Sequence, residues 1–211
     1  MIQHFCHNWA FYTLLTWLPS FLKDELAFDL KSAGFVSVAP YFACMVFAIA
    51  GGFLADRVIA RGVAIVTVRR GAQVFAELLP AIATVACSYV SDKYVAVALI
   101  TLSVGFSGTA GAGYGSNHLD LIPEHAGALF GLSNSIATIP GIVSPWLTGV
   151  ILGDYKAPAV PPVSHWRIVF YLSSGLVVVG LACYLLMSRA TYIDLDTDDS
   201  GSDDVEDGGR G

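Results

Sequence analysis

Polar side chains recur at every fourth position of the first apolar segment of the chain. They are His4, Asn8, Tyr12 and Thr16, and in a helix they share one side, with His7 beside them. The amide, the phenol hydroxyl and a protonated imidazole can all donate hydrogen bonds to a ligand. Polar groups inside an apolar segment usually face a partner or a cavity. We therefore predict a cavity lining here, and a polar seam to a neighbouring helix is the alternative.

A second polar pair lies in the apolar segment 126–152. Asn134 and Thr138 are one helical turn apart, and Pro140 and Pro145 follow them. Proline removes a backbone donor and kinks a helix. The pattern is typical of moving transport helices, although kinked helices that serve only packing also exist.

A single acidic residue, Glu77, interrupts the apolar segment 71–91. A carboxyl inside such a segment must be protonated, paired or in contact with water. We consider a role in proton or cation coupling. The alternative is a salt link to the nearby Arg69 and Arg70, with no coupling role.

These polar groups are set in six long stretches with almost no charge. Residues 1–22, 32–55, 94–119, 126–153 and 168–188 contain no Asp, Glu, Lys or Arg, and 71–91 contains only Glu77. A helix of about 20 apolar residues spans a hydrocarbon core about 30 Å thick. The sequence therefore predicts an all-α integral membrane protein with six transmembrane helices.

The predicted organisation is one six-helix body over residues 1–190 and an acidic, disordered cytoplasmic tail over residues 191–211. Residues 192–211 hold eight acids and one arginine, so they cannot bury enough apolar surface to fold. The helices are expected at about 2–22, 33–54, 71–90, 94–116, 126–152 and 166–188.

Composition excludes several classes of protein. The chain is 55% hydrophobic and 13% charged, and its mean hydropathy is +0.64, unlike an ordinary soluble domain. No large basic field suggests nucleic acid. The four cysteines show neither zinc-site spacing nor a disulfide framework. The glycines at 105–115 indicate close helix packing, since no βαβ pattern surrounds them. We expect no enzyme, cofactor or metal.

The orientation rests on one loop rich in arginine. Arg57, Arg61, Arg69 and Arg70 crowd the connection between the second and third predicted helices. The positive-inside rule places such a cluster in the cytoplasm. Both termini are then cytoplasmic as well.

Several motifs resemble one transporter family. The segment GFLADRVIARG, from Gly52 to Gly62, resembles the signature loop of the major facilitator superfamily. The segments HFCHNWAFYTLLTWLP, VRRGAQ, SNHLDLIPEHAGALFGLSN and ATIPGIVSPWLTG resemble the second half of its anion/cation symporter family. That family includes sialin, vesicular glutamate transporters, type I sodium–phosphate transporters and plant anion transporters, and the plant-type members look nearest. The resemblance covers about residues 4–188.

The resemblance implies secondary active transport of a small organic or inorganic anion, coupled to sodium, protons or membrane potential. It implies a twelve-helix fold in which this chain supplies the last six helices, either as a fragment or, less favoured, as a half-size protein that dimerises. The partners are then the anion, the coupling ion, the bilayer and a second six-helix half. Plasma, vesicular or lysosomal, and plastid membranes all stay open. The alternative from another class is a non-transporting scaffold or receptor-like half-transporter.

The resemblance also suggests roles for residues. An anion needs donors, so the residues expected along its path are His7, Asn8, Tyr12, Tyr41, Asn134 and Thr138. The expected gating loop comprises Gly52 for close helix approach, Asp56 at a facing helix N-terminus, and Arg57 and Arg61. His7 occupies a position where the vesicular glutamate transporters carry an arginine, and Glu77 departs from the apolar residue expected there. Both remain candidates for ion coupling, and His7 is a candidate pH sensor.

Overall fold

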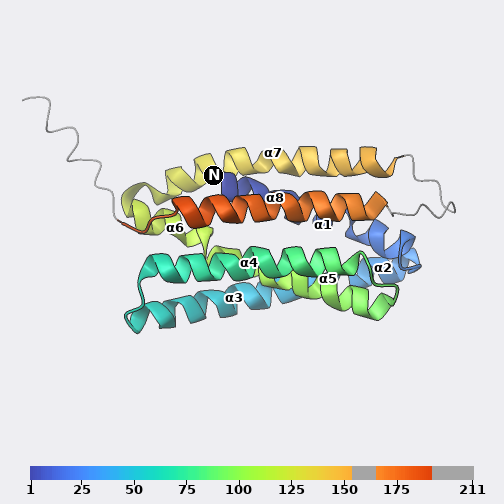
Figure 1. The fold of residues 1–211 in the computed structure, drawn as a ribbon, viewed down its shortest axis with the longest axis horizontal. Helices are drawn as coiled ribbons and strands as arrows, with labels where there is room; N and C mark the ends of the chain where they lie inside the picture. The colour runs from blue at the N-terminus through green and yellow to red at the C-terminus, as the bar shows by residue number, and fades with distance from the viewer. Residues whose placement is uncertain (154–164, 192–211) are drawn as a thin grey trace, which may run out of the picture.

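Long helices lie side by side along one axis of the molecule (Figure 1). The computed structural model describes residues 1–153 and 165–191, and every regular element in these ranges is a helix. The all-α prediction is therefore confirmed for this part of the chain. The predicted tail, apart from Thr191, lies outside the described residues.

The helix boundaries differ from the predicted ones in three of the helices. The second is divided at Ser37 and continues to Ala60 instead of 54, the third begins at Ile65 instead of 71, and the fourth is interrupted at 108–113 but continues to Leu121. Glycines at the interruption favour a break. The elements in chain order are α1 (Ile2–Asp24), α2 (Leu30–Val36), α3 (Val38–Ala60), α4 (Ile65–Cys87), α5 (Lys93–Ser107), η1 (Gly108–Gly111), α6 (Tyr114–Leu121), η2 (Pro123–His125), α7 (Ala126–Leu152) and α8 (His165–Met187).

Four helical stretches among the described residues are both long enough and apolar enough to cross a bilayer. They are Lys31–Ala60, Lys93–Leu121, Pro123–Leu152 and His165–Met187. Helices α1 and α4 have 23 residues each, which is sufficient length, but they carry more polar groups. For α1 and α4, a membrane span stays a prediction.

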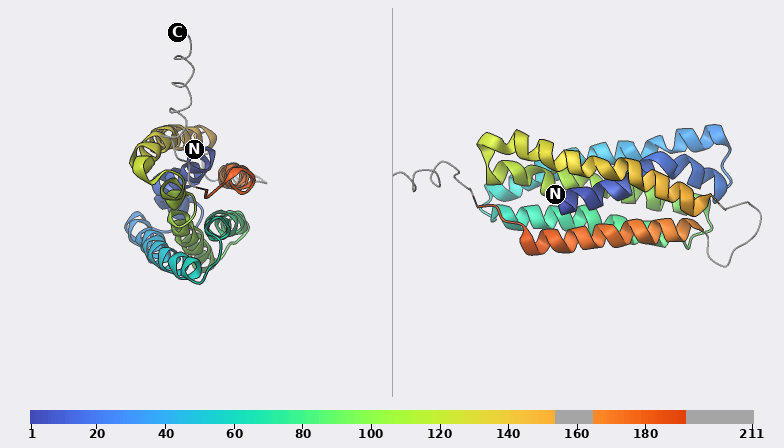
Figure 2. Two further views of the ribbon diagram at one scale, coloured as in Figure 1. Left: turned by 90° about the vertical axis from the view of Figure 1, so that its left-hand side faces the viewer. Right: turned by 90° about the horizontal axis from the view of Figure 1, so that it is seen from above.

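Helix α1 lies inside the bundle, where it contacts more than one neighbouring helix. It packs against α7 and α8, while α4 packs against α5 and α8, and α3 against α5. The end-on view in Figure 2 shows α1 between α7 and α8. At one end, Phe21 of α1 packs edge to face on Trp166 and Phe170 of α8. This aromatic cluster holds α1 against α8.

Small residues allow α5 and η1 to approach α3 closely, as the glycines predicted. A Cβ on Gly105 would lie 3.3 Å from Phe47, and one on Gly108 would overlap the Cys44 carbonyl. On α3, the glycine in close contact is Gly51, whose added Cβ would lie 3.0 Å from Thr109, whereas one on Gly52 would meet open space. Within the described chain, the close approach expected of Gly52 belongs to Gly51.

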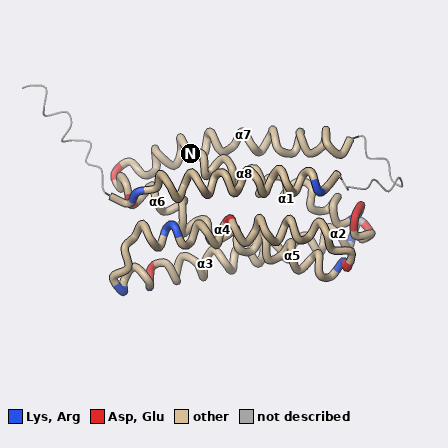
Figure 3. Tube along the Cα trace, in the orientation of Figure 1, with Lys and Arg blue, Asp and Glu red and all other residues tan. Residues whose placement is uncertain are grey.

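Charged residues gather at the two ends of the bundle (Figure 3). The α3–α4 loop, α6 and the end of α8 share one end (Figure 1). Two contacts tie this end together, since Arg69 pairs with Asp120 and Arg70 bonds Ser188. Glu77 is the one acidic residue in the sequence of α4 and lies near the middle of that helix.

Candidate functional site

Glu77 is the centre of a buried hydrogen-bond network. Its side chain is 2% exposed, and three nitrogen atoms approach its Oε1 atom. Gln3 Nε2 donates at 2.6 Å, Gln73 Nε2 donates at 2.8 Å, and His7 Nδ1 lies at 2.8 Å. A carboxyl can be buried in this way because polar partners replace the water that it loses.

Helical spacing brings these partners together. Gln3 and His7 are four residues apart on α1, and Gln73 and Glu77 are four apart on α4, so each pair shares one side of its helix. Gln73 also accepts a hydrogen bond from the backbone nitrogen of Tyr114 at 2.9 Å. The network therefore links α1 and α4 to the start of α6.

A glycine in the break between η1 and α6 makes this contact of Gln73 possible. A Cβ on Gly113 would overlap the amide of Gln73. Because only a glycine leaves this space, the amide of Gln73 can reach the backbone of Tyr114. The sequence indicated close packing at 105–115 but gave no sign of this contact.

The alternative of a salt link from Glu77 to Arg69 or Arg70 is not what the structure shows. Arg69 instead makes a bidentate pair with Asp120, with Nε–Oδ2 at 2.7 Å and Nη2–Oδ1 at 3.1 Å. Arg70 donates to the hydroxyl and carbonyl of Ser188. Both arginines therefore have partners of their own at the end of the bundle, and Glu77 pairs with His7.

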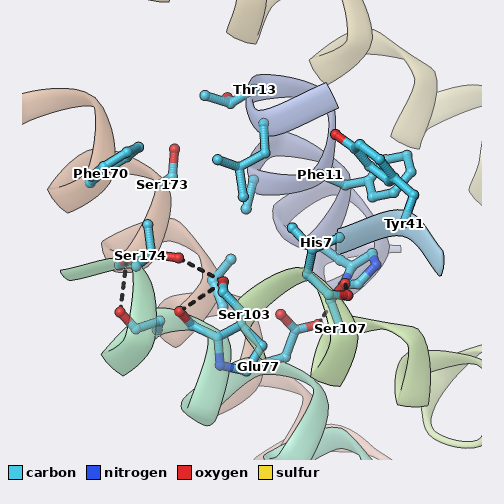
Figure 4. Close-up of a pocket in the computed structure, with 17 residues that line it drawn as sticks. His7, Phe11, Thr13, Tyr41, Glu77, Ser103, Ser107, Phe170, Ser173 and Ser174 are labelled. Atoms are coloured by element: carbon cyan, nitrogen blue, oxygen red, sulfur yellow. Dashed lines mark hydrogen bonds and ion pairs between the residues drawn. The ribbon is translucent and has the colours of Figure 1, made fainter. Parts of the chain in front are cut away.

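An internal cavity of about 40 Å³ adjoins the Glu77 network. Helices α1, α3, α4, α5 and α8 surround it, and His7, Tyr41 and Glu77 line it together (Figure 4). Hydroxyl groups cover much of the remaining polar wall. They belong to Thr13, Thr84, Ser103, Ser107, Ser173 and Ser174.

On its other side, α1 forms a polar seam with α7. Asn8 Nδ2 donates to the carbonyl of Ala137 at 2.8 Å, and His4 Nδ1 lies 3.0 Å from the hydroxyl oxygen of Ser133. For His4 and Asn8, the seam is therefore the observed arrangement. That Asn8 lines the anion path stays a prediction, and it concerns only the part of the Asn8 side chain that α7 does not cover.

The ring of Tyr12 packs over a glycine of α7. A Cβ on Gly141 would lie 3.2 Å from this ring. Asn134 and Thr138, also on α7, are exposed, and the Thr138 hydroxyl donates to the Asn134 carbonyl of its own helix. The structure does not bring Asn134 or Thr138 to His7.

The predicted gating residues lie at the end of α3. Asp56, Arg57 and Arg61 are exposed, and the guanidinium of Arg57 lies 4.3 Å from the centre of the Phe53 ring. No described residue forms an ion pair with Asp56. Their role in gating stays a prediction.

Among the described residues, no three His, Cys, Asp or Glu side chains gather in a way that could hold a metal ion. The four cysteines are free thiols, and Cys6 and Cys87 are buried. The sequence interpretation missed Gln3, Gln73 and Asp120. A signal for the first two was present, since each glutamine precedes His7 or Glu77 by one helical turn.

Comparison with known proteins agrees with this architecture. Residues 1–201 match the Major Facilitator Superfamily. The chain is 35% identical to sialin of Homo sapiens over 191 residues, which is 90% of this chain and 37% of that protein.

Two plant proteins of Arabidopsis thaliana are similar to the same degree. The chain is 34% identical to the chloroplastic sodium-dependent phosphate transport protein 1 over 190 residues, 90% of this chain and 35% of that protein. It is 34% identical to the chloroplastic ascorbate transporter over 193 residues, 92% of this chain and 34% of that protein. The chain thus spans about a third of the length of these relatives.

The family consists of transporters and not of enzymes. With its apolar helices and its match along most of its length, this multi-pass membrane protein belongs to the Major Facilitator Superfamily.

Proposed function

We propose that this chain forms one six-helix half of a twelve-helix secondary transporter for a small anion, such as phosphate or a carboxylate. The match to the superfamily and the relatives named for phosphate and ascorbate transport support this substrate class. Helices α1 and α4 count as the two further spans. Glu77 of α4 is paired with His7 of α1, and Arg69 of α4 with Asp120, as a membrane requires of ionisable groups within a span.

The coupling ion in this proposal is the proton. The observation that carries it is the buried pair of Glu77 and His7. With one proton on the pair its net charge is zero, and without that proton its net charge is −1. A buried negative charge repels an incoming anion more strongly than it would in water. Loss of the proton therefore opposes entry of the anion, and its uptake favours entry, which is the behaviour of a symporter.

The environment of Glu77 favours a proton over sodium. Sodium requires several oxygen ligands, but the Oε1 atom is surrounded by nitrogen atoms of Gln3, His7 and Gln73. Of these groups, the amides can only donate to Oε1 through nitrogen. At Oε1, sodium would have to displace these donors, whereas a proton can be shared with His7.

The anion path in this proposal passes His7 on the α4 side of α1, includes Tyr12 on the α7 side, and continues past Tyr41. These three side chains can donate hydrogen bonds to an anion. Asn8 contributes to this path the part of its side chain that does not contact α7. The exposed Asn134 and Thr138 of α7 would meet the path where the second half packs against this one.

Gating is assigned to the exposed end of α3. Asp56 would meet the positive end of a helix in the other half, where the dipole favours a negative charge. Arg57 and Arg61 would complete this cytoplasmic latch. Opening and closing of the latch would bias the alternation between the two access states.

The test uses the full-length protein, with the preceding half, reconstituted in liposomes. Uptake of phosphate, ascorbate and acidic sugars is measured under an imposed pH gradient, sodium gradient or membrane potential. We expect accumulation of one anion class under an inward proton gradient. If no gradient drives uptake of any anion, while a known transporter is active in parallel vesicles, the proposed function is wrong.

A variant assigns the coupling to Glu77. Glu77→Gln keeps the shape of the side chain but cannot exchange a proton. We expect it to lose proton-driven accumulation while it still exchanges anion for anion across the membrane. Glu124→Gln removes an exposed carboxylate and serves as the matched control, which should behave as the parent does. Sodium-driven uptake that survives Glu77→Gln would exclude the proton as the coupling ion.

A further inference from the structure

The cavity beside Glu77 offers more than packing space. We infer that it binds water, and that this water is the route by which the carboxyl of Glu77 exchanges protons. The inference deepens the proposed function, since it gives the coupling proton a path. It is tested on the carboxyl group itself, so it can hold or fail independently of transport.

The hydrogen bonds of Glu77 point to this route. All of them engage Oε1, and no described residue forms a hydrogen bond with Oε2. A proton shared with His7 lies on the line between Nδ1 and Oε1. It leaves that line through the second oxygen of the carboxyl or the second nitrogen of the imidazole. Both side chains line the cavity (Figure 4), so water there would adjoin both groups.

The cavity has the size and the polar partners that water needs. A volume of about 40 Å³ is sufficient, because a buried water needs only about 10–15 Å³ of space and two to four polar partners. The hydroxyls of Tyr41 and Ser173 are buried and have no hydrogen-bond partner among the described residues. Water in the cavity would give each of these hydroxyls a partner, since buried polar groups are rarely left unpaired.

Hydroxyl groups extend from Glu77 across the cavity. Thr84 and Ser103 are bonded to each other at 2.7 Å between α4 and α5, and Ser103 also approaches the Pro80 carbonyl at 3.2 Å. Hydroxyls both donate and accept, so with water between them they can relay a proton. Tyr41 lies at the α3 side of the cavity, edge-on to Phe11. We assign this side as the entrance, because Tyr41 is only half-buried.

Other titratable groups near Glu77 are few. His7 and Cys6 of α1 and Tyr114 of α6 interact with it electrostatically. Helix α8 contributes Cys183, which lies near Cys6, and α3 contributes Tyr41 and Cys44. Helix α5 supplies hydroxyls at this level and carries its only charged residue, Lys93, at its far end. Of all these groups, only His7 is hydrogen-bonded to Glu77.

The experiment follows the carboxyl of Glu77 by infrared spectroscopy in the full-length protein. The pH is changed rapidly between about pH 5 and pH 8, the range in which imidazole titrates. The Glu77 band, protonated or ionised, is identified by its loss in Glu77→Gln. Ser173→Leu fills the cavity, and Ser135→Leu makes the same change at an exposed position of α7.

We expect Ser173→Leu to slow the Glu77 response about tenfold, because a bridging water is displaced, and Ser135→Leu to match the parent. If Ser173→Leu does not fold, Tyr41→Phe deletes the hydroxyl at nearly constant volume, with the exposed Tyr94→Phe as its control. Tyr41→Phe should slow the response severalfold. An unchanged rate in the cavity variants, or a Glu77 band that does not respond to pH at all, would overturn the inference.

Discussion

The two sides of α1 hold their neighbours by different means. Toward α4, Gln3 and His7 meet the buried carboxyl of Glu77, so this side contains a carboxyl–imidazole pair. Toward α7, His4 and Asn8 bond a hydroxyl and a backbone carbonyl. Neighbouring residues of a helix differ by about 100° in direction, so Gln3 and His4 reach different helices. The lesson is that polar residues close together in the sequence of one helix can serve two interfaces with different chemistry.

The largest expected effect concerns the side of α1 that faces α4. His7→Leu removes one partner of a buried pair and leaves the Glu77 carboxyl without its imidazole. We expect a loss of about 3–5 kcal/mol in the free energy of unfolding, measured by denaturation of the full-length protein in detergent. The double variant His7→Leu with Glu77→Gln should recover most of this loss. If His7→Leu were no more harmful than a change on the α7 side, the contrast between the two sides would disappear.

A smaller effect is expected on the side of α1 that faces α7. Asn8→Leu deletes the hydrogen bond to the Ala137 carbonyl but leaves no charge unpaired. Hydrogen bonds between membrane helices contribute about 0.6–2 kcal/mol, so the loss should lie in this range in the same denaturation assay. A double-mutant cycle with His7→Leu should be nearly additive, because the two side chains contact different helices. Strong coupling between them would show that the two interfaces act as one.

The smallest effect is expected on the exposed face of α7. Thr138→Val removes a hydroxyl that bonds only the backbone of its own helix. The free energy of unfolding should change by less than about 0.5 kcal/mol. The same variant sharpens the path proposal, because anion affinity should fall if Thr138 meets the anion path. A large loss of stability without a change in affinity would instead place Thr138 in an interface with the other half.

The sequence predicted the helices better than the contacts between them. Apolar length is a local property, so it marked the helical segments, and small residues marked the close approach of α5 to α3. The predicted boundary was wrong for α4, whose polar side chains have partners in other parts of the chain. Helix α4 begins early, at Ile65, and its arginines are paired by Asp120 and Ser188.

The candidate site was predicted only in part. The sequence predicted that a buried Glu77 needs a partner. The identity of that partner depends on which face of α1 approaches α4, and residue spacing within one helix does not contain this information. His7 and Glu77 were selected separately and prove to be bonded to each other. Asn134 and Thr138 were predicted from their depth in the segment, but they lie on an exposed face of α7.

Two of the charged groups of α4, Glu77 and Arg69, receive their partners at different times during synthesis. His7 precedes Glu77 by 70 residues, whereas Asp120 follows Arg69 by 51 residues. When α4 leaves the ribosome, the imidazole is already in place, but the carboxylate for Arg69 has not yet been made. Because an unpaired arginine resists insertion, we expect α4 to settle only after α6 emerges. Nascent chains arrested before and after Asp120 would differ in the labelling of a cysteine placed at Val63, and equal labelling would contradict this order. The final position of α4 is thus set by a residue that does not yet exist when α4 first meets the membrane.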